Sequence, residues 1–263
     1  MRQTLLLIVG LIIGCTVQAK NRVIEEPPFC VRNTTSIEVS KIILSDTATV
    51  LHIYAKYRPK NWIRIASESY LQDNNGETYL LRSGIGITPG KQFWMPESGE
   101  AEFQLVFPPL LAKVTSIDFT EGEGVEGAFS IWGIQLKSKE LPKLMLPQEA
   151  VAHPIDKNAA LPAPFVQYGN TTVKGKLLDY RPCMMKELSL YLSEPSKGYA
   201  DPIKAEIKRD GSFNITFPVM GTTAAAINLL GTDINFFVEP EQTSELYINL
   251  REISRKKSTF HKS

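Results

Sequence analysis

The segment INFFVEPEQTSELYINL, residues 234–250, carries the clearest strand pattern in the chain, and its last part decides how the fold closes. Apolar and polar side chains alternate along it, which is the period of a β-strand with one buried face. Residues 239–243 combine a proline with polar side chains and predict a turn between two paired strands. After the turn, Leu246, Ile248 and Leu250 form one apolar row. We therefore predict a strand pair that completes a β-sheet core.

The same period of two extends upstream of this segment. TTVKGKLLD and KELSLYLSE each place apolar residues on one face, and DPIKAEIKRDGSFNITFPV predicts a hairpin that turns on Asp210 and Gly211. Strands this short pack as layers over a shared core. Residues 170–253 are therefore predicted to form a small antiparallel β-sandwich of about seven strands.

Residues 28–137 show a second set of short alternating segments. Asn74, Asn75 and Gly76 supply the positive-φ turn of a tight hairpin. In AEFQLVFPP the residues Phe103, Leu105 and Phe107 share one face. No amphipathic helix separates these segments. This pattern is typical of an antiparallel sandwich of immunoglobulin-like type. The predicted fold class is all-β, with two sandwich domains.

The segment between the two predicted domains, residues 138–169, is rich in proline and lacks strand alternation, so it is predicted to be a linker. The short stretch LPKLMLPQ within it is apolar enough to pack against a domain. Residues 254–263 form a basic tail. A solvated end is the expected state of such a tail, and contact with anionic lipid headgroups is the alternative.

The N-terminus, MRQTLLLIVGLIIGCTVQAK, has the features of an export signal. Arg2 provides the positive charge, and the apolar run that follows is too short to serve as a stable membrane anchor. Two processing sites compete. Cleavage after Ala19 would remove residues 1–19 as a signal peptide, whereas the IIGC motif would make Cys15 the lipidated first residue of a lipoprotein. Either reading predicts an exported protein, in the periplasm or at the outer membrane, and membrane association only if Cys15 is lipidated.

Composition excludes some classes of function. The 263 residues carry a formal net charge of +1, so there is no basic excess of the kind that binds nucleic acid. The chain has no C-x-x-C motif and therefore lacks the dithiol of thioredoxin-type redox chemistry. Beyond Ala19 two cysteines remain, Cys30 and Cys183. They either pair as a disulfide across the two domains or act as small apolar fillers, and we favour the second reading.

No catalytic, cofactor-binding or metal-binding residue is predicted. His52, His153 and His261 fall on a strand, in the linker and in the tail, and a lone histidine is usually a surface or boundary residue. The loop IDFTEGEGVEG gathers four carboxylates but does not have the spacing of a calcium loop, so we interpret it as solvated. Its carboxylates belong to Asp118, Glu121, Glu123 and Glu126. The chain has no G-x-S-x-G motif, and two small sandwiches offer little room for a deep sugar cleft.

The tryptophans are the strongest signal for binding. All three, Trp62, Trp94 and Trp132, lie in the first predicted domain. FSIWGIQL places Trp132, Ile134 and Leu136 on the face opposite Phe129 and Ile131, so this strand has apolar residues on both faces. Such a strand is either covered on both sides, which we favour, or turned towards a partner. The candidate partner surface therefore consists of Trp132, Ile134, Leu136, Trp62 and Trp94.

Ordered phrases in both predicted domains resemble a known family. The run from VIEEPPFCVRNTTSIEVSK to TSIDFTEGEG, followed by FSIWGIQL, is similar to the N-terminal region of exported thioredoxin-like (TlpA-type) disulfide reductases of Bacteroidota. TTVKGKLLDYRP, DGSF and FFVEPEQTSELYINLREISR are similar to the small β-domain that follows in that family. In that family a helical segment and a thioredoxin domain with the C-x-x-C site come next. No residue of this chain matches that site, so the resemblance implies the accessory region without the reductase activity.

These observations together predict an exported, non-catalytic accessory protein that binds a protein partner in the cell envelope through sheet edges or through the apolar strand at Trp132. One alternative is a partner of a separately encoded thioredoxin domain in a periplasmic redox system. The other is a carbohydrate-binding module, in which an exposed Trp62 or Trp94 is the platform.

Overall fold

A computed structural model describes residues 21–122, 127–148, 150, 167–193, 201–256 and 258–261. Strands dominate these residues, and the one helix among them is short. The predicted signal peptide and Cys15 lie outside the described residues. The prediction of a mainly β, mainly antiparallel protein is confirmed.

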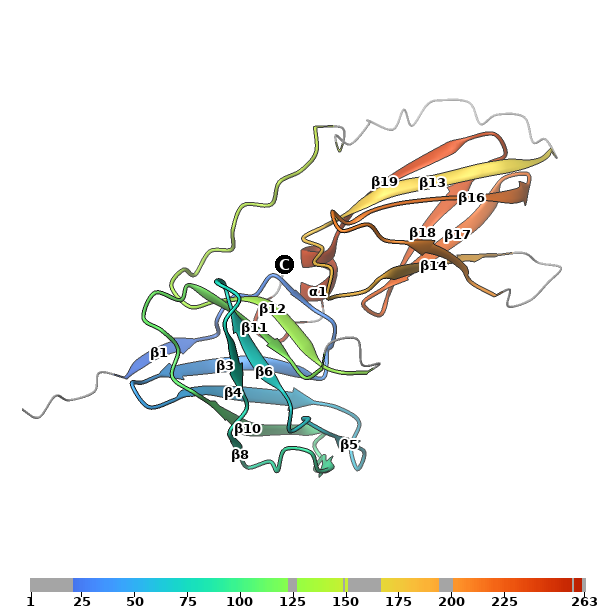
Figure 1. Cartoon of the computed structure of the whole chain (residues 1–263). Coiled ribbons are helices and arrows are strands. Elements are labelled where there is room, and N and C mark those ends of the chain that lie inside the picture. The colour runs from blue at the N-terminus through green and yellow to red at the C-terminus, as the bar shows by residue number, and fades with distance from the viewer. Residues whose placement is uncertain are drawn as a thin grey trace, which may run out of the picture.

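The first half of the chain forms two five-stranded sheets and a two-stranded ribbon. The sheet orders are β1-β3-β4-β10-β8 and β2-β12-β11-β6-β7, and the ribbon is β5-β9. Figure 1 shows β3, β4 and β10 in one layer and β6, β11 and β12 in the other. The strands are β1 (Arg22–Glu25), β2 (Val31–Arg32), β3 (Ile37–Leu44), β4 (Thr49–Lys56), β5 (Trp62–Ile63), β6 (Tyr70–Asp73), β7 (Thr78–Leu80), β8 (Ser83–Ile85), β9 (Phe93–Trp94), β10 (Glu100–Phe107), β11 (Ser116–Thr120) and β12 (Ser130–Gln135).

One apolar core lies between these two sheets. The row Phe103, Leu105 and Phe107 of β10 is buried as its alternation predicts. From the other sheet, Phe119 and Ile131 belong to the same cluster, so both layers contribute to a common core. Gly76 has a φ of 89° in the turn between β6 and β7, which confirms the predicted hairpin. Strand β1 begins before residue 28 and was not predicted.

The second half contains two sheets, of orders β16-β13-β19 and β15-β14-β17-β18. A second apolar cluster is built from residues of both sheets. The elements are β13 (Tyr168–Leu178), β14 (Glu187–Leu192), β15 (Ile203–Glu206), β16 (Ser212–Met220), β17 (Thr223–Leu229), β18 (Thr232–Val238), β19 (Thr243–Asn249) and α1 (Leu250–Arg255).

The predicted strand pair at residues 234–250 is wrong. β18 pairs antiparallel with β17, whereas β19 crosses to the other sheet and runs parallel to β13. Leu250 does not extend the strand but begins α1, where the Asn249 side chain accepts a hydrogen bond from the backbone N–H of Glu252 and caps the helix. The burial part of the prediction survives, since Ile248 and Leu250 are buried. A period of two reports which face is buried and not which strand is the neighbour.

The hairpin at Asp210 and Gly211 is likewise only partly correct. The turn exists, and Gly211 has a φ of 83°. However, β15 before the turn belongs to the four-stranded sheet and β16 after it to the three-stranded sheet, so only an isolated bridge between Ile207 and Phe213 joins the two arms. The segment connects two layers instead of forming two adjacent strands.

A β-bulge in β12 changes the faces predicted for its apolar residues. In the pairing of β11 with β12, Ile117 lies opposite Ile134 and Phe119 opposite Ile131, so Asp118 alone faces both Trp132 and Gly133. Gly133 has a φ of 69°, and its N–H donates to Asp118 Oδ1 at 2.6 Å. The extra residue returns Ile134 to the same core as Ile131. Trp132 therefore points away from that core.

Candidate functional site

Residues from both halves meet at a junction, which we define by Cys30, Val31, Trp132, the segment 179–186 and the C-terminal residues 250–261. Cys30, Val31 and Trp132 come from the first half but belong to the apolar cluster of the second. Leu177 and Leu250 are buried in the same cluster. The junction is therefore packed with apolar side chains and is not a solvent-filled gap.

A buried ion pair holds the C-terminal segment at the junction. Arg32 Nη1 lies 2.8 Å from Glu38 Oε1, and the two side chains are 1% and 4% exposed. The Ser258 hydroxyl donates to Glu38 Oε2 at 2.9 Å, and the Thr259 N–H donates to Glu38 Oε1 at 2.8 Å. Arg32 Nε donates in turn to the carbonyl oxygen of Ser254 at 3.3 Å. The pair thus binds the tail through both of its members.

Aromatic contacts extend this docking. His261 packs edge-on against Phe29, with ring centroids 5.4 Å apart, and Phe260 packs against Tyr54 at 5.7 Å. Burial and the nearby Arg255 lower the pKa of His261, which favours the neutral ring. In residues 258–261 the expectation of a solvated tail is wrong, because four consecutive residues contact the first half. The prediction of a solvated tail was based on its basic residues. The contacts with the first half are instead made by its small and aromatic residues.

Two further ion pairs surround the thiol of Cys30. Arg181 pairs with Asp118, and Arg251 Nε pairs with Asp179 Oδ2 at 2.6 Å. Arg251 also donates to the carbonyl oxygen of Pro142, which ties the described part of the predicted linker to the junction. Burial raises the pKa of Cys30, and the positive charge of Arg251 opposes that rise. The thiol is therefore kept neutral and is a poor nucleophile.

Cys30 and Cys183 do not form a disulfide in this structure. Cys30 is buried and fills space, whereas Cys183 is exposed. The interpretation of the cysteines as apolar fillers therefore fits Cys30 but does not fit Cys183.

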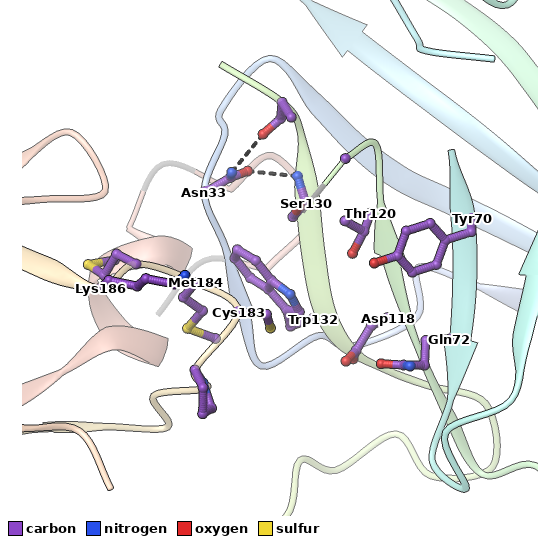
Figure 2. Close-up of a pocket in the computed structure, with 14 residues that line it drawn as sticks. Asn33, Tyr70, Gln72, Asp118, Thr120, Ser130, Trp132, Cys183, Met184 and Lys186 are labelled. Atoms are coloured by element: carbon purple, nitrogen blue, oxygen red, sulfur yellow. Dashed lines mark hydrogen bonds between the residues drawn. The ribbon is translucent and has the colours of Figure 1, made fainter. Parts of the chain in front are cut away.

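A cavity of about 670 Å³ opens beside the junction. Figure 2 shows Tyr70, Gln72, Asp118 and Thr120 on neighbouring strands of the first half, with Trp132 between them and Met184 of the second half. Its volume is in the range of small-ligand sites. However, the Asp118 carboxylate is engaged by Arg181 and by the Gly133 N–H. Trp132 is almost fully buried and offers a ligand little of its ring.

The prediction of a partner surface at β12 is corrected by the burial of its side chains. Trp132, Ile134 and Leu136 are 3%, 1% and 2% exposed. Trp132 is covered by the second half, as the favoured reading expected, and Ile134 and Leu136 are covered by the opposing sheet of the first half. In this structure these three side chains present no surface to a partner.

Trp62 and Trp94 behave differently. They lie directly opposite each other in the ribbon β5-β9, and they are 45% and 61% exposed. Ile63 and Phe93, the neighbouring pair, face inwards and contact the first core. Side chains that are opposite in an antiparallel pair lie on the same face about 5 Å apart at Cβ, so the two indoles share one surface. Both residues were identified from the sequence. Because they are 32 residues apart in the chain, no local pattern indicated that they lie opposite each other.

A second cavity, of about 620 Å³, lies beside this ribbon. Trp62 and Tyr57 contribute aromatic surface to it, and Asn61, Arg64 and Glu68 contribute polar groups. Tyr57 directly follows the end of β4 at Lys56 and is exposed. This cavity combines exposed aromatic rings with hydrogen-bonding groups.

Glu121 is a buried carboxylate at the edge of the same cavity. Its two oxygens accept hydrogen bonds from the N–H groups of Ala66 and Phe129, each at 2.8 Å. Burial raises its pKa despite these two bonds, which favour the charged form. The acidic loop was expected to be solvated, and at Glu121 that expectation is wrong.

The remaining predicted residues do not converge on a metal site. Asp118 is paired with Arg181, and Glu123, Glu126 and His153 lie outside the described residues. His52 lies on β4, where burial and Lys41 lower its pKa. Among the described residues no group of three or more His, Cys, Asp or Glu side chains is placed to hold a metal ion. That part of the chain also contains no helix with the length and hydropathy needed to cross a bilayer.

Comparison with known proteins identifies no family. No protein-family model and no curated protein matches the chain. Among solved structures, pullulanase from Anoxybacillus sp. LM18-11 in complex with maltotriose is 11% identical with a TM-score of 0.22, over 72% of this chain and 24% of the pullulanase. The Bacillus anthracis TIE protein is 7% identical with a TM-score of 0.21, over 89% of this chain and 40% of that one. The chain therefore spans about a quarter of the pullulanase, and these distant likenesses carry no argument about function.

Proposed function

We propose that the protein is an exported, non-catalytic binding protein of the cell envelope, and that its binding surface is the pair Trp62 and Trp94. The export signal in residues 1–19 supports the location. The resemblance to the accessory region of thioredoxin-like reductases supports a role without chemistry of its own. In this proposal the two halves are two immunoglobulin-like sandwich domains joined by a linker, and the first of them carries the binding surface.

The observation that carries the proposal is the exposure of two indoles side by side. A soluble protein gains nothing in stability from leaving this much aromatic surface in water. Tryptophan is the residue most enriched at the energetic centres of protein interfaces, because it combines a large apolar area with little side-chain entropy to lose. Exposed Tyr57 lines the same cavity as Trp62 and adds aromatic surface there. A protein partner that covers this surface is the function the geometry supports best.

Photo-crosslinking in the producing cell tests the proposal. A photoreactive phenylalanine analogue at position 94 is expected to give one discrete adduct, detected by mass spectrometry. The matched control is position 168, because Tyr168 is an aromatic residue on the second half that is at least as exposed as Trp94. Equal labelling from both positions, or none from position 94, would contradict the proposal. An adduct with a protein that carries C-x-x-C would assign the partner to a redox system.

With the partner in hand, the double change Trp62→Ala and Trp94→Ala is expected to weaken binding by roughly a hundredfold or more, since single central tryptophans often contribute about 2 kcal/mol or more. Isothermal titration calorimetry measures this loss. Tyr168→Ala should leave the affinity unchanged.

The second candidate function is carbohydrate binding, and the cavity beside Trp62 favours it. The apolar face of a pyranose ring stacks on an indole, and its hydroxyl groups need the donors and acceptors that Asn61, Arg64 and Glu68 supply around the cavity. On a glycan array, the unmodified protein is expected to bind a defined set of sugars and the Trp62→Ala variant none of them. An array without any specific signal would eliminate this candidate.

A further inference from the structure

We propose that the free edge of β18 pairs with the same strand of a second copy of this chain, so that two four-stranded sheets join into one. This inference is independent of the proposed binding surface, because β18 lies in the second half and Trp62 in the first.

β18 is the last strand of the order β15-β14-β17-β18, and within the described residues no strand pairs with its second edge. The seven residues Thr232–Val238 pair with β17 without a register shift, so the strand is long, regular and without a bulge. An edge of this kind presents a row of unpaired N–H and C=O groups and is a template for another strand.

Soluble proteins usually protect such edges by lysine, proline, a bulge or short length. β18 has none of these features, and Asp233 is its one charged residue. Two other edges of the sheets in the second half do have them, since β16 contains Pro218 and β15 is four residues long and carries Lys204. β19 is also seven residues long and, like β18, carries one acidic residue, Glu245, and no lysine or proline. Of these two unprotected edges, β18 is the one with a large exposed apolar side chain, Phe237.

The apolar side chains of β18 are incompletely covered. Ile234 and Phe236 face the second core but are only partly buried, whereas Val238 on the same face is 1% exposed. On the outer face, Phe237 is 70% exposed. A neighbouring strand on the free edge would cover both faces and increase the burial of all three side chains.

The sequence of β18 is complementary to itself, which points to a second copy as the occupant. An antiparallel pair related by a two-fold axis and using all seven residues is centred on Asn235, which then lies opposite its own copy. On the inner face Ile234 lies opposite Phe236 of the other copy. On the outer face Asp233 lies opposite Phe237, so no two like charges face each other. In this register the apolar row of Ile234 and Phe236 continues across the axis.

Sedimentation equilibrium of the purified protein between about 1 µM and 1 mM tests the inference, a range chosen because one strand pair is a small interface. We expect a reversible monomer–dimer equilibrium. Asn235→Lys places two positive charges opposite each other at the axis and is expected to weaken the dimer roughly tenfold or more. Asn235 is exposed, so this change leaves the monomer folded.

The matched control is Thr78→Lys, which adds the same charge at an exposed position of the edge strand β7 in the first half. It should leave the dimer unchanged. In a Cys183→Ser background, Asn235→Cys should form a disulfide-linked dimer on oxidation, because opposed Cβ atoms lie close enough for that bond after a small adjustment. Thr78→Cys should remain monomeric. A protein that stays monomeric at every concentration, or a dimer that Asn235→Lys does not weaken, would overturn the inference.

Discussion

Replacement of Glu38 by alanine is expected to lower the free energy of unfolding by about 3–5 kcal/mol, which is the usual cost of removing one member of a buried ion pair. The change leaves the Arg32 guanidinium buried without a counterion, and its Nη2 already has no hydrogen-bond partner. Ser258 and Thr259 lose their common acceptor at the same time. The variant should therefore both unfold more easily and release the C-terminal segment.

Urea unfolding followed by circular dichroism measures the loss of stability. Trypsin digestion under native conditions reports the tail separately, since release should speed cleavage after Arg255 and Lys256. The control is Glu100→Ala, which removes an exposed carboxylate paired with Lys56 and should change stability by less than about 1 kcal/mol. A Glu38 variant that matches this control in both measurements would show that the pair does not hold the tail.

The second large effect is expected for Gly133→Ala, with a loss of about 3 kcal/mol. Part of the cost is the left-handed backbone, because a φ of 69° costs a residue with a Cβ roughly 1–2 kcal/mol. The remainder is crowding, since the new Cβ would lie 2.7 Å from the sulfur of Cys30 and 2.9 Å from its Cβ. Overpacking of this kind typically costs about 1–3 kcal/mol.

Gly76→Ala separates the two causes. Gly76 also has a positive φ, of 89°, but a Cβ there would meet no atom within 4 Å, so only backbone strain applies. Urea unfolding should show a clearly smaller loss for Gly76→Ala than for Gly133→Ala. Combining Gly133→Ala with Cys30→Ala should recover part of the difference, because the close sulfur is removed. Equal losses at the two glycines would mean that the packing at Cys30 is not tight.

The sequence predicted those features that depend on local pattern. The alternation in β10 placed Phe103, Leu105 and Phe107 in the core, and the Asn74-Asn75-Gly76 turn placed a hairpin, because both signals depend on a few neighbouring residues. The partners of β18 and β19 could not be predicted in this way. Strand pairing across the sheets is decided by long-range packing, and the same apolar row suits an antiparallel or a parallel neighbour.

The candidate surface shows the same limit. At β12, one extra residue at Gly133 shifted Ile134 and Leu136 into the first core, and a period count that assumes a regular strand misplaces every residue beyond a bulge. In the tail, charge suggested solvation, whereas Ser258 and His261 are held by partners more than 200 residues away in the chain. Trp62 and Trp94 could be identified from the sequence because a single tryptophan is already a candidate binding residue, whatever strand it pairs with.

The contact between Glu38 and Ser258 also has a consequence for the order of folding. The two residues are separated by 220 positions, so Glu38 receives its hydroxyl partner only after 220 further residues have been made. Contacts of such long sequence separation form late, because closing the loop between them costs entropy before any contact is gained. The first half can build its sheets early, but Glu38 and Arg32 obtain their full set of partners only when residues 254–259 have been made and have docked. The stability of the Arg32–Glu38 region thus depends on a segment that is synthesised more than 200 residues later.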